Sequence, residues 1–278
     1  MFYVMPYNSR FSVLNLKEII EVNIFCVKTI KKLSKKNYFI AADPIHCSTN
    51  ETIRLCNLFK KKGADACSLI FGEKYYSDRQ VYEHFKSISK KTNLDLFLHQ
   101  QEFEKGIYNN KKKHYSINLL NKILSLKNFI GMKEDSKIDL YTNKIVNKFK
   151  LKKIILTSGQ GKKQWLKFSK NCYGWISGIS NIDPFLGLYF YKEYERKNYR
   201  NCKKFINDFE KPFFKISNEY GWHRVIKTFL YFQNLMQIHE RKPGGKLSRS
   251  ELSQTKNCFK KMKKISQTSY HSLFFNKP

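Results

Sequence analysis

Short apolar runs alternate with longer amphipathic stretches along the first two thirds of this 278-residue chain. That alternation is typical of βα units built around a parallel sheet. Each expected strand is followed by an expected helix, and parallel strands need such crossover connections. The strands are expected at 2–5, 38–42, 66–71, 95–99, 128–133, 153–157 and 172–177, and the helices at 15–34, 49–62, 78–91, 115–125, 137–148, 162–169 and 183–195.

After about residue 197 the strand pattern stops and only helical periodicity continues, over 198–217, 220–238 and 247–265. No low-complexity linker separates this part from the rest. We therefore expect a βα body over 1–197, a C-terminal helical extension of the same domain over 198–265, and a loosely ordered tail over 266–278.

The chain is strongly basic, with 53 Lys+Arg against 22 Asp+Glu and a formal net charge of +31. Such a charge raises the question of a nucleic acid or another polyanion as a partner. The basic residues are spread in ones, twos and threes, together with many Asn, Ile, Phe and Tyr, as an AT-rich genome would produce. A compositional origin is favoured, nucleic acid is not expected as a partner, and polyanion binding stays the alternative.

Seven cysteines include no CxxC pair and no Cys/His cluster with zinc spacing, so neither a metal nor a disulfide framework is expected. The start of the chain lacks the features of a signal peptide, and no apolar run approaches the length of a membrane span. A cytoplasmic protein without membrane contact is the simplest interpretation.

Lys133 stands where the apolar run 128–133 ends, directly before two acids. A lysine at the end of a buried strand must be paired, reach solvent, or be held near neutrality for chemistry. By itself the segment favours a lysine that reaches solvent, because lysine is abundant in this chain. A reactive amine is the alternative.

The segments around Lys133 favour the reactive amine instead, because several motifs occur in a particular order. Together they resemble the dihydrodipicolinate synthase / N-acetylneuraminate lyase family of class I aldolases, over roughly residues 6–197. Each motif is weak alone, and the ordered set is fairly specific. The matching segments are Gly63–Ala66, Tyr82–Lys86, Asn128–Ser136, Ser158–Gly159, Gly174–Gly178 and Asn181–Pro184, with Gly221–His223 suiting the C-terminal extension.

The resemblance implies a TIM (β/α)8 barrel with the site at the strand ends. It implies that Lys133 forms a Schiff base with pyruvate or a related 2-keto acid, and that no separate cofactor is needed. Backbone groups near Gly159 and the side chain of Ile176 would line the pyruvate pocket; an ordinary turn and an ordinary core residue are the alternatives. Members of the family are commonly oligomers, so a homotetramer or homodimer is expected.

The chain departs from the family at several functional positions. His99 replaces the proton-shuttling tyrosine, and histidine can also transfer protons near neutral pH; a purely structural histidine at a strand end is the equal alternative. The loop that holds the carboxylate of pyruvate loses its threonines and glycines. Donors there could come instead from Tyr7, Asn8, Ser9 and Arg10, although a solvated loop residue is the favoured interpretation of Arg10.

The arginine that binds the second substrate's carboxylate would fall near Glu104, and an acid cannot hold a carboxylate. This argues against dihydrodipicolinate synthesis itself. Because the polar residues Gln100, Gln101 and Glu102 are expected to crowd the mouth of the site, a sugar acid is the substrate we expect.

Compared with the family, the barrel lacks its first βα unit, since Tyr3 to Pro6 matches the second strand. An upstream start, a partner segment that fills the gap, or a decayed copy would each explain this. The alternative functions are a catalytically impaired barrel that serves as a scaffold or binding protein, and a basic polyanion-binding protein.

Overall fold

The computed structural model describes residues 1–4, 13–42, 48–71, 76–102, 114–150 and 152–270. The chain divides into two compact units. The first contains Met1–Gln160 and Gln164–Ile176, and the second contains Gly161–Lys163 and Ser177–Pro278.

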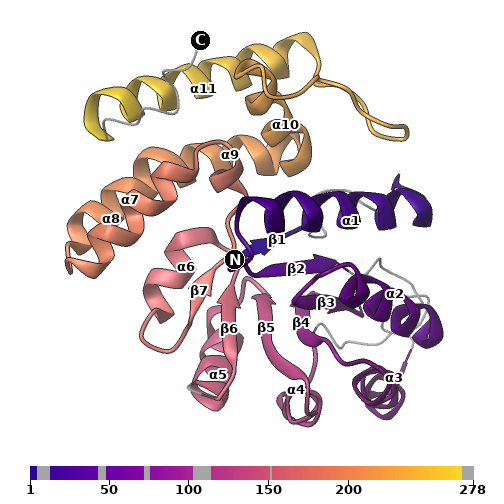
Figure 1. Ribbon diagram of the computed structural model, residues 1–278. Coiled ribbons are helices and arrows are strands. Elements are labelled where there is room, and N and C mark those ends of the chain that lie inside the picture. The colour runs from indigo at the N-terminus through magenta and orange to yellow at the C-terminus, as the bar shows by residue number, and fades with distance from the viewer. Residues whose placement is uncertain (5–12, 43–47, 72–75, 103–113, 151, 271–278) are drawn as a thin grey trace. The chain divides into compact units, whose positions relative to one another are not determined.

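The first unit is built on a single sheet of seven parallel strands that pair in the order of the chain. The strands fan around a common centre, with helices along the outer side (Figure 1). This confirms the α/β fold predicted from the alternating pattern. The strands are β1 (Phe2–Tyr3), β2 (Phe39–Ala42), β3 (Ala66–Ile70), β4 (Asp95–Gln101), β5 (Phe129–Asp135), β6 (Ile154–Thr157) and β7 (Gly174–Trp175).

One apolar core cluster of this unit lies on the concave side of the sheet. Ile40, Ala66, Phe97 and Leu156 form a buried cluster contributed by four different strands, and Tyr3, Ile154 and Ile176 pack against it among others. The middle strands are buried on both faces, which explains why their sequences are continuous apolar runs.

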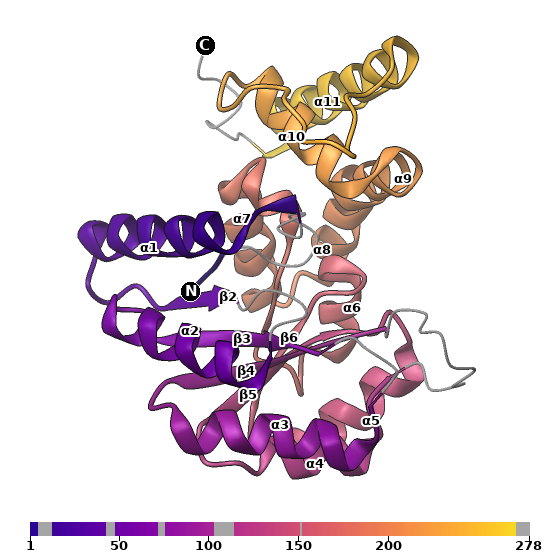
Figure 2. The same cartoon turned by 90° about the vertical axis from the view of Figure 1, so that its right-hand side faces the viewer.

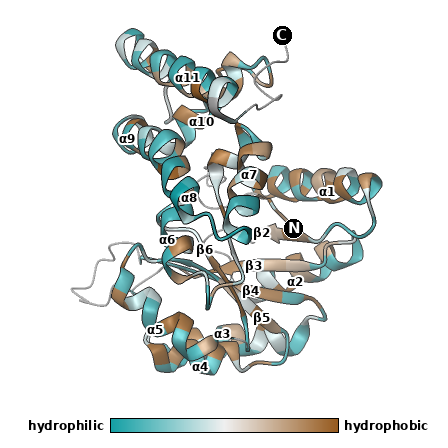
Figure 3. Cartoon of the chain, turned by 90° about the vertical axis from the view of Figure 1, so that its left-hand side faces the viewer, coloured by the Kyte–Doolittle hydropathy of each residue, from teal (hydrophilic) through white to brown (hydrophobic). Residues whose placement is uncertain are grey.

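The helices of the first unit begin at polar caps that the sequence supplies. Asn15 and Glu18 form a capping box at α1, and the Ser48, Ser77 and Ser116 side chains accept backbone N–H groups at α2, α3 and α4. Hydrophilic and hydrophobic sectors both occur on these helices (Figure 3), as expected where one face packs on a sheet. The helices are α1 (Leu16–Leu33), α2 (Thr49–Lys61), α3 (Asp78–Lys91), α4 (Ile117–Leu124) and α5 (Asp139–Phe149).

The two longest strands, β4 and β5, each run two residues beyond their predicted ends. Their register pairs His99 with Lys133, and it shifts once, between Leu96 and Phe97. A side chain at Gly131 would place its Cβ only 2.3 Å from the carbonyl oxygen of Ile154, so the close approach of β5 and β6 requires glycine there. Among the described residues β1 and β7 are the edges of the sheet.

The second unit is helical. Only the first three residues of α6 (Gly161–Phe168) belong to this unit. Its other elements are the 3-10 turn Gly178–Asn181, α7 (Pro184–Glu195), α8 (Tyr199–Phe205), a π-helical turn (Ile206–Glu210), α9 (Lys211–Tyr220), α10 (Trp222–Phe232) and α11 (Arg249–Tyr270). Helices α9, α10 and α11 pack on one another (Figure 2).

Several helix bounds in this unit differ from the sequence prediction. The helix expected over 198–217 is interrupted by the π-helical turn Ile206–Glu210 and continues to Tyr220. The stretch predicted to be helical over 220–238 ends at Phe232, where Asn234 adopts a left-handed conformation with φ of 56°. The last helix continues to Tyr270, beyond its predicted end at residue 265. Within the parts of the chain that the structure describes, none of the helices has the length and apolar character to cross a membrane.

Candidate active site

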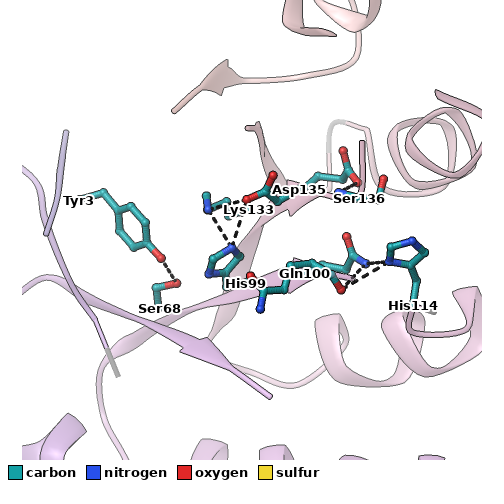
Figure 4. Close-up of polar contacts among 10 residues, drawn as sticks. Tyr3, Ser68, His99, Gln100, His114, Lys133, Asp135 and Ser136 are labelled. Carbon is teal, nitrogen blue, oxygen red and sulfur yellow. Dashed lines mark hydrogen bonds and ion pairs between the residues drawn. The ribbon is translucent and has the colours of Figure 1, made fainter. Parts of the chain in front are cut away.

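Three ionisable side chains meet on the inner face of the sheet, in a triad formed by Lys133, His99 and Asp135 (Figure 4). The Lys133 Nζ lies 2.7 Å from His99 Nε2 and 3.0 Å from Asp135 Oδ2. His99 Nε2 lies 3.6 Å from the same Asp135 oxygen. Lys133 is only 3% exposed and His99 2%, so the triad is almost fully removed from water.

Strand geometry explains why these three side chains meet. Successive side chains of a strand point to opposite faces, so Lys133 and Asp135 share the inner face of β5. The register of the sheet places His99 on β4 directly beside Lys133. The extra two residues of β5 therefore carry Asp135 into the site.

Burial and charge set the protonation states of the triad. Burial, and then the nearby Lys133 charge, lower the pKa of His99 to about 4. Burial alone would raise the pKa of the Asp135 carboxyl, but the neighbouring Lys133 charge overcomes it and holds this pKa well below its usual range. Near neutral pH, His99 is a neutral base and Asp135 is an anion.

The short contact between Lys133 and His99 is a path for a proton. An ammonium group has no lone pair, so Nε2 of the neutral imidazole must accept the hydrogen bond when Lys133 is charged. His99 Nε2 is thus the hydrogen-bond acceptor next to the Lys133 amine.

A tyrosine and a serine flank the triad from neighbouring strands. Tyr3 on β1 donates its hydroxyl to Ser68 Oγ on β3, at 2.8 Å, and the Tyr3 ring centroid lies 6.0 Å from Lys133 Nζ (Figure 4). Sequence reasoning did not identify Asp135, Tyr3 or Ser68. The two-residue period of β5 could have identified Asp135, whereas Tyr3 and Ser68 carry no local signal.

The acid next to Lys133 in the chain, Glu134, faces the opposite side of β5. It accepts hydrogen bonds from Ser136 N, Thr142 Oγ1 and Gln164 Nε2, and burial raises the pKa of its carboxyl. Glu134 therefore fastens the end of β5 to the surrounding helices and is separate from the triad.

Gln100 also lies on this outer side. Its Nε2 is 2.8 Å from His114 Nδ1, so its side chain turns away from Lys133 (Figure 4). The expectation that Gln100 crowds the mouth of the site is wrong, because alternate residues of β4 point to opposite faces.

The structure places the two residues expected to line a pyruvate pocket in the first unit. A Cβ at Gly159 would lie 2.9 Å from the backbone nitrogen of Lys137, a residue with φ of 62°, so glycine is required by this close approach. Ile176 packs on the inner core cluster, and its N–H donates to the carbonyl of Thr157 at 2.8 Å. Their contacts with a substrate stay predictions.

The residues expected to bind a carboxylate, Tyr7, Asn8, Ser9 and Arg10, lie outside the described residues, as does Glu104. Over the described ranges, no group of three or more His, Cys, Asp or Glu side chains is arranged to hold a metal ion.

Comparison with known proteins adds independent information to this geometry. The sequence model of the dihydrodipicolinate synthetase family matches residues 10–262. A curated relative, the 4-hydroxy-tetrahydrodipicolinate synthase of Anaplasma marginale (strain Florida), is 25% identical over 182 residues. That match spans 64% of this chain and 56% of the relative, so the chain covers little more than half of the relative's length.

Solved structures resemble the fold over more of the chain. The 4-hydroxy-tetrahydrodipicolinate synthase of Methylacidiphilum fumariolicum SolV has a TM-score of 0.82 and 19% identity, covering 97% of this chain and 86% of that one. The N-acetylneuraminate lyase of Mycoplasma synoviae has a TM-score of 0.78 and 17% identity, covering 94% and 84% respectively. At these identities the structural likeness supports the TIM-barrel fold and nothing finer.

Proposed function

Because the chain belongs to the dihydrodipicolinate synthetase family, as the resemblance in its motifs predicted, we propose that it is a carbon–carbon lyase of the class I aldolase type. In this proposal Lys133 forms an imine with pyruvate or a related 2-keto acid. The iminium then accepts the electron pair released when a C–C bond breaks, or supplies an enamine when one forms.

The observation that carries the proposal is the 2.7 Å contact between Lys133 Nζ and His99 Nε2 inside the sheet. Only a free amine has the lone pair needed to attack a carbonyl carbon. His99 accepts the proton from Lys133, and the amine attacks. The protonated imidazole then returns a proton to the hydroxyl of the addition product, which leaves as water. His99 can next remove a proton from the carbon beside the iminium.

The substrate we propose is a sugar acid or another 2-keto acid other than the one used in dihydrodipicolinate synthesis. The support is the acid at position 104, where the family has an arginine for the second substrate's carboxylate. That departure argues only against dihydrodipicolinate synthesis. The reason for a sugar acid was the polar group Gln100, Gln101 and Glu102, of which Gln100 points outward and Gln101 lies on the same face of β4 as His99.

We further propose that the protein acts as a homotetramer or homodimer in the cytoplasm and needs no cofactor besides the imine of Lys133. Ser9 and Arg10 are proposed to supply donors for the substrate carboxylate, together with Tyr7 and Asn8. Gly159 and Ile176 are proposed to line the same pocket.

Borohydride reduction in the presence of each of a panel of 2-keto acids and sugar acids tests the proposal. We expect a reduced adduct on the Lys133 peptide with pyruvate, absent from Lys133→Arg, and release of pyruvate from one of the sugar acids. If no keto acid leaves an adduct on Lys133, the lyase is excluded and a scaffold or binding protein is the better interpretation.

A further inference from the structure

We propose that Asp135 is a further catalytic residue, the fixed counter-ion for the single positive charge that passes between Lys133 and His99 during imine formation. The proposal rests on the proposed function of Lys133 and adds a residue to it. Asp135 touches the reacting nitrogen directly, since its Oδ2 lies 3.0 Å from Lys133 Nζ.

The contacts of Asp135 are confined to the two nitrogens that exchange the proton. Within the described ranges, its carboxylate accepts a hydrogen bond from Lys133 Nζ and lies 3.6 Å from His99 Nε2, and it has no other polar partner. Glu134, its neighbour in the chain, instead has three partners from the backbone and from neighbouring helices. A carboxylate that served only to fasten the strand would be expected to resemble Glu134.

Among the described residues, the strand neighbours of His99 and Lys133 carry no charge that could replace Asp135. The residues that pair with His99 and Lys133 on the adjacent strands β3 and β6 are Ile70 and Leu156, both apolar. The Tyr3 hydroxyl is directed to Ser68. Over the part of the chain that is described, Asp135 is thus the one carboxylate in contact with the triad's two nitrogens.

The reaction conserves one positive charge at this place. An ammonium and a neutral carbonyl give an iminium and one molecule of water: the C–N bonds form with the nitrogen's electrons, and the C–O bonds break with their electrons leaving on oxygen. Between these states the charge resides on His99, after it has accepted the proton. Lys133 Nζ and His99 Nε2 lie 3.0 and 3.6 Å from the same Asp135 oxygen, so the charge stays paired at every step.

Removing that anion would leave an unpaired cation in a dry interior at each stage. An opposite charge at this distance changes the protonation midpoint of a neighbouring group by about one to three pH units. We therefore expect Asp135 to increase the affinity of His99 for the proton and to stabilise the iminium that follows.

Imidazole NMR of the free protein tests the charge coupling without any substrate, with the His99 signal assigned from a His99→Asn spectrum. In Lys133→Met, the loss of the neighbouring cation should raise the midpoint of His99. Adding Asp135→Asn to that variant should lower the midpoint again by at least about one pH unit. An unchanged midpoint would overturn the proposal.

The rate of borohydride-trapped adduct formation with pyruvate tests the catalytic part. Asp135→Asn and Asp135→Ser should slow trapping at least about tenfold, with a changed pH profile, while Asp135→Glu retains part of the rate. Asp139→Asn, which removes an exposed carboxylate paired with Lys167, is the matched control and should trap at the wild-type rate. Trapping by Asp135→Asn within twofold of wild type would refute the role. Absence of any adduct in the wild type would refute the proposed lyase activity instead. The NMR experiment uses no substrate, so it would still test the charge coupling between Asp135 and His99.

Discussion

Two buried lysines, one in each compact unit, show how the same side chain can be held for different purposes. Lys162, at the start of α6, has its Nζ 3.2 Å from Glu210 Oε1 and 3.3 Å from Ser177 Oγ. The Glu210 carboxylate also accepts the backbone N–H of Lys162 at 2.9 Å, and both side chains are fully buried. Lys133 has a carboxylate partner too, but that carboxylate is 12% exposed and a neutral imidazole lies beside it.

The difference between the two sites is the presence of a base. The Lys162 ammonium lies over the rings of Phe190 and Phe205, with centroids 5.8 and 5.2 Å from Nζ, and its carboxylate is also tied to the backbone. Such surroundings stabilise the ammonium group by contacts with aromatic rings and a carboxylate. At Lys133 a neutral imidazole lies 2.7 Å from Nζ, and in the proposed mechanism it takes the proton away. Burial of a lysine is therefore common to structural and reactive sites, and the neighbouring acceptor distinguishes them.

The largest effect is expected from Lys133→Arg. The guanidinium keeps a positive charge near Asp135 but cannot form an imine, so we expect adduct formation to disappear, a loss of at least about a thousandfold. The free energy of unfolding, measured in urea, should change little. Residual adduct at the wild-type level would mean that a different lysine reacts.

Glu210→Ala should have the next largest effect, on stability instead of on adduct formation. It leaves the Lys162 charge buried without its carboxylate, so the free energy of unfolding should fall by about 3–5 kcal/mol. Replacing both partners, Lys162→Met with Glu210→Leu, should recover most of that loss. Unchanged stability in Glu210→Ala would remove the contrast between the two lysines.

His99→Asn should slow adduct formation at Lys133 by about a hundredfold or more, because it removes the proton acceptor and leaves the nucleophile. The final amount of trapped adduct after long incubation should approach that of the wild type. Equal rates for the variant and the wild type would show that another group accepts the proton.

The effect that is smallest per pH unit is the dependence of the free energy of unfolding on pH. The pKa of His99 is about 4 in the folded protein, below the ordinary 6.5, so the unfolded chain binds this proton first as the pH falls. Stability should therefore decrease between pH 6.5 and 4, by up to about 1.4 kcal/mol per pH unit from this group. Urea unfolding of His99→Asn should show a shallower decrease. His84, whose pKa burial also lowers to about 4, contributes a second and separable slope.

The sequence predicted the βα body well because its signals are local. Alternating apolar runs and caps such as Ser77 are visible within a few residues, and the motif order identified Lys133 and His99. Strand register is a property of two segments at once, so the two extra residues of β4 and β5 and the shift after Leu96 could not be predicted.

The pairing of Lys162 with Glu210 could not be predicted either, since 48 residues separate them and neither lies in a motif. Asp135 is an intermediate case. It lies two residues after Lys133, so on one strand the two side chains share a face. The prediction that the strand ends at residue 133 left Asp135 outside the strand.

The exchange of the methyl protons of pyruvate with deuterium, followed by proton NMR in D2O, tests the central claim most directly. An iminium on Lys133 acidifies those protons and His99 removes them, so exchange requires both the nucleophile and the base and needs no second substrate. The account predicts exchange catalysed by the wild type, none above background with Lys133→Arg, and slow exchange with His99→Asn. Exchange that persists in Lys133→Arg, or its absence from the wild type, would contradict it.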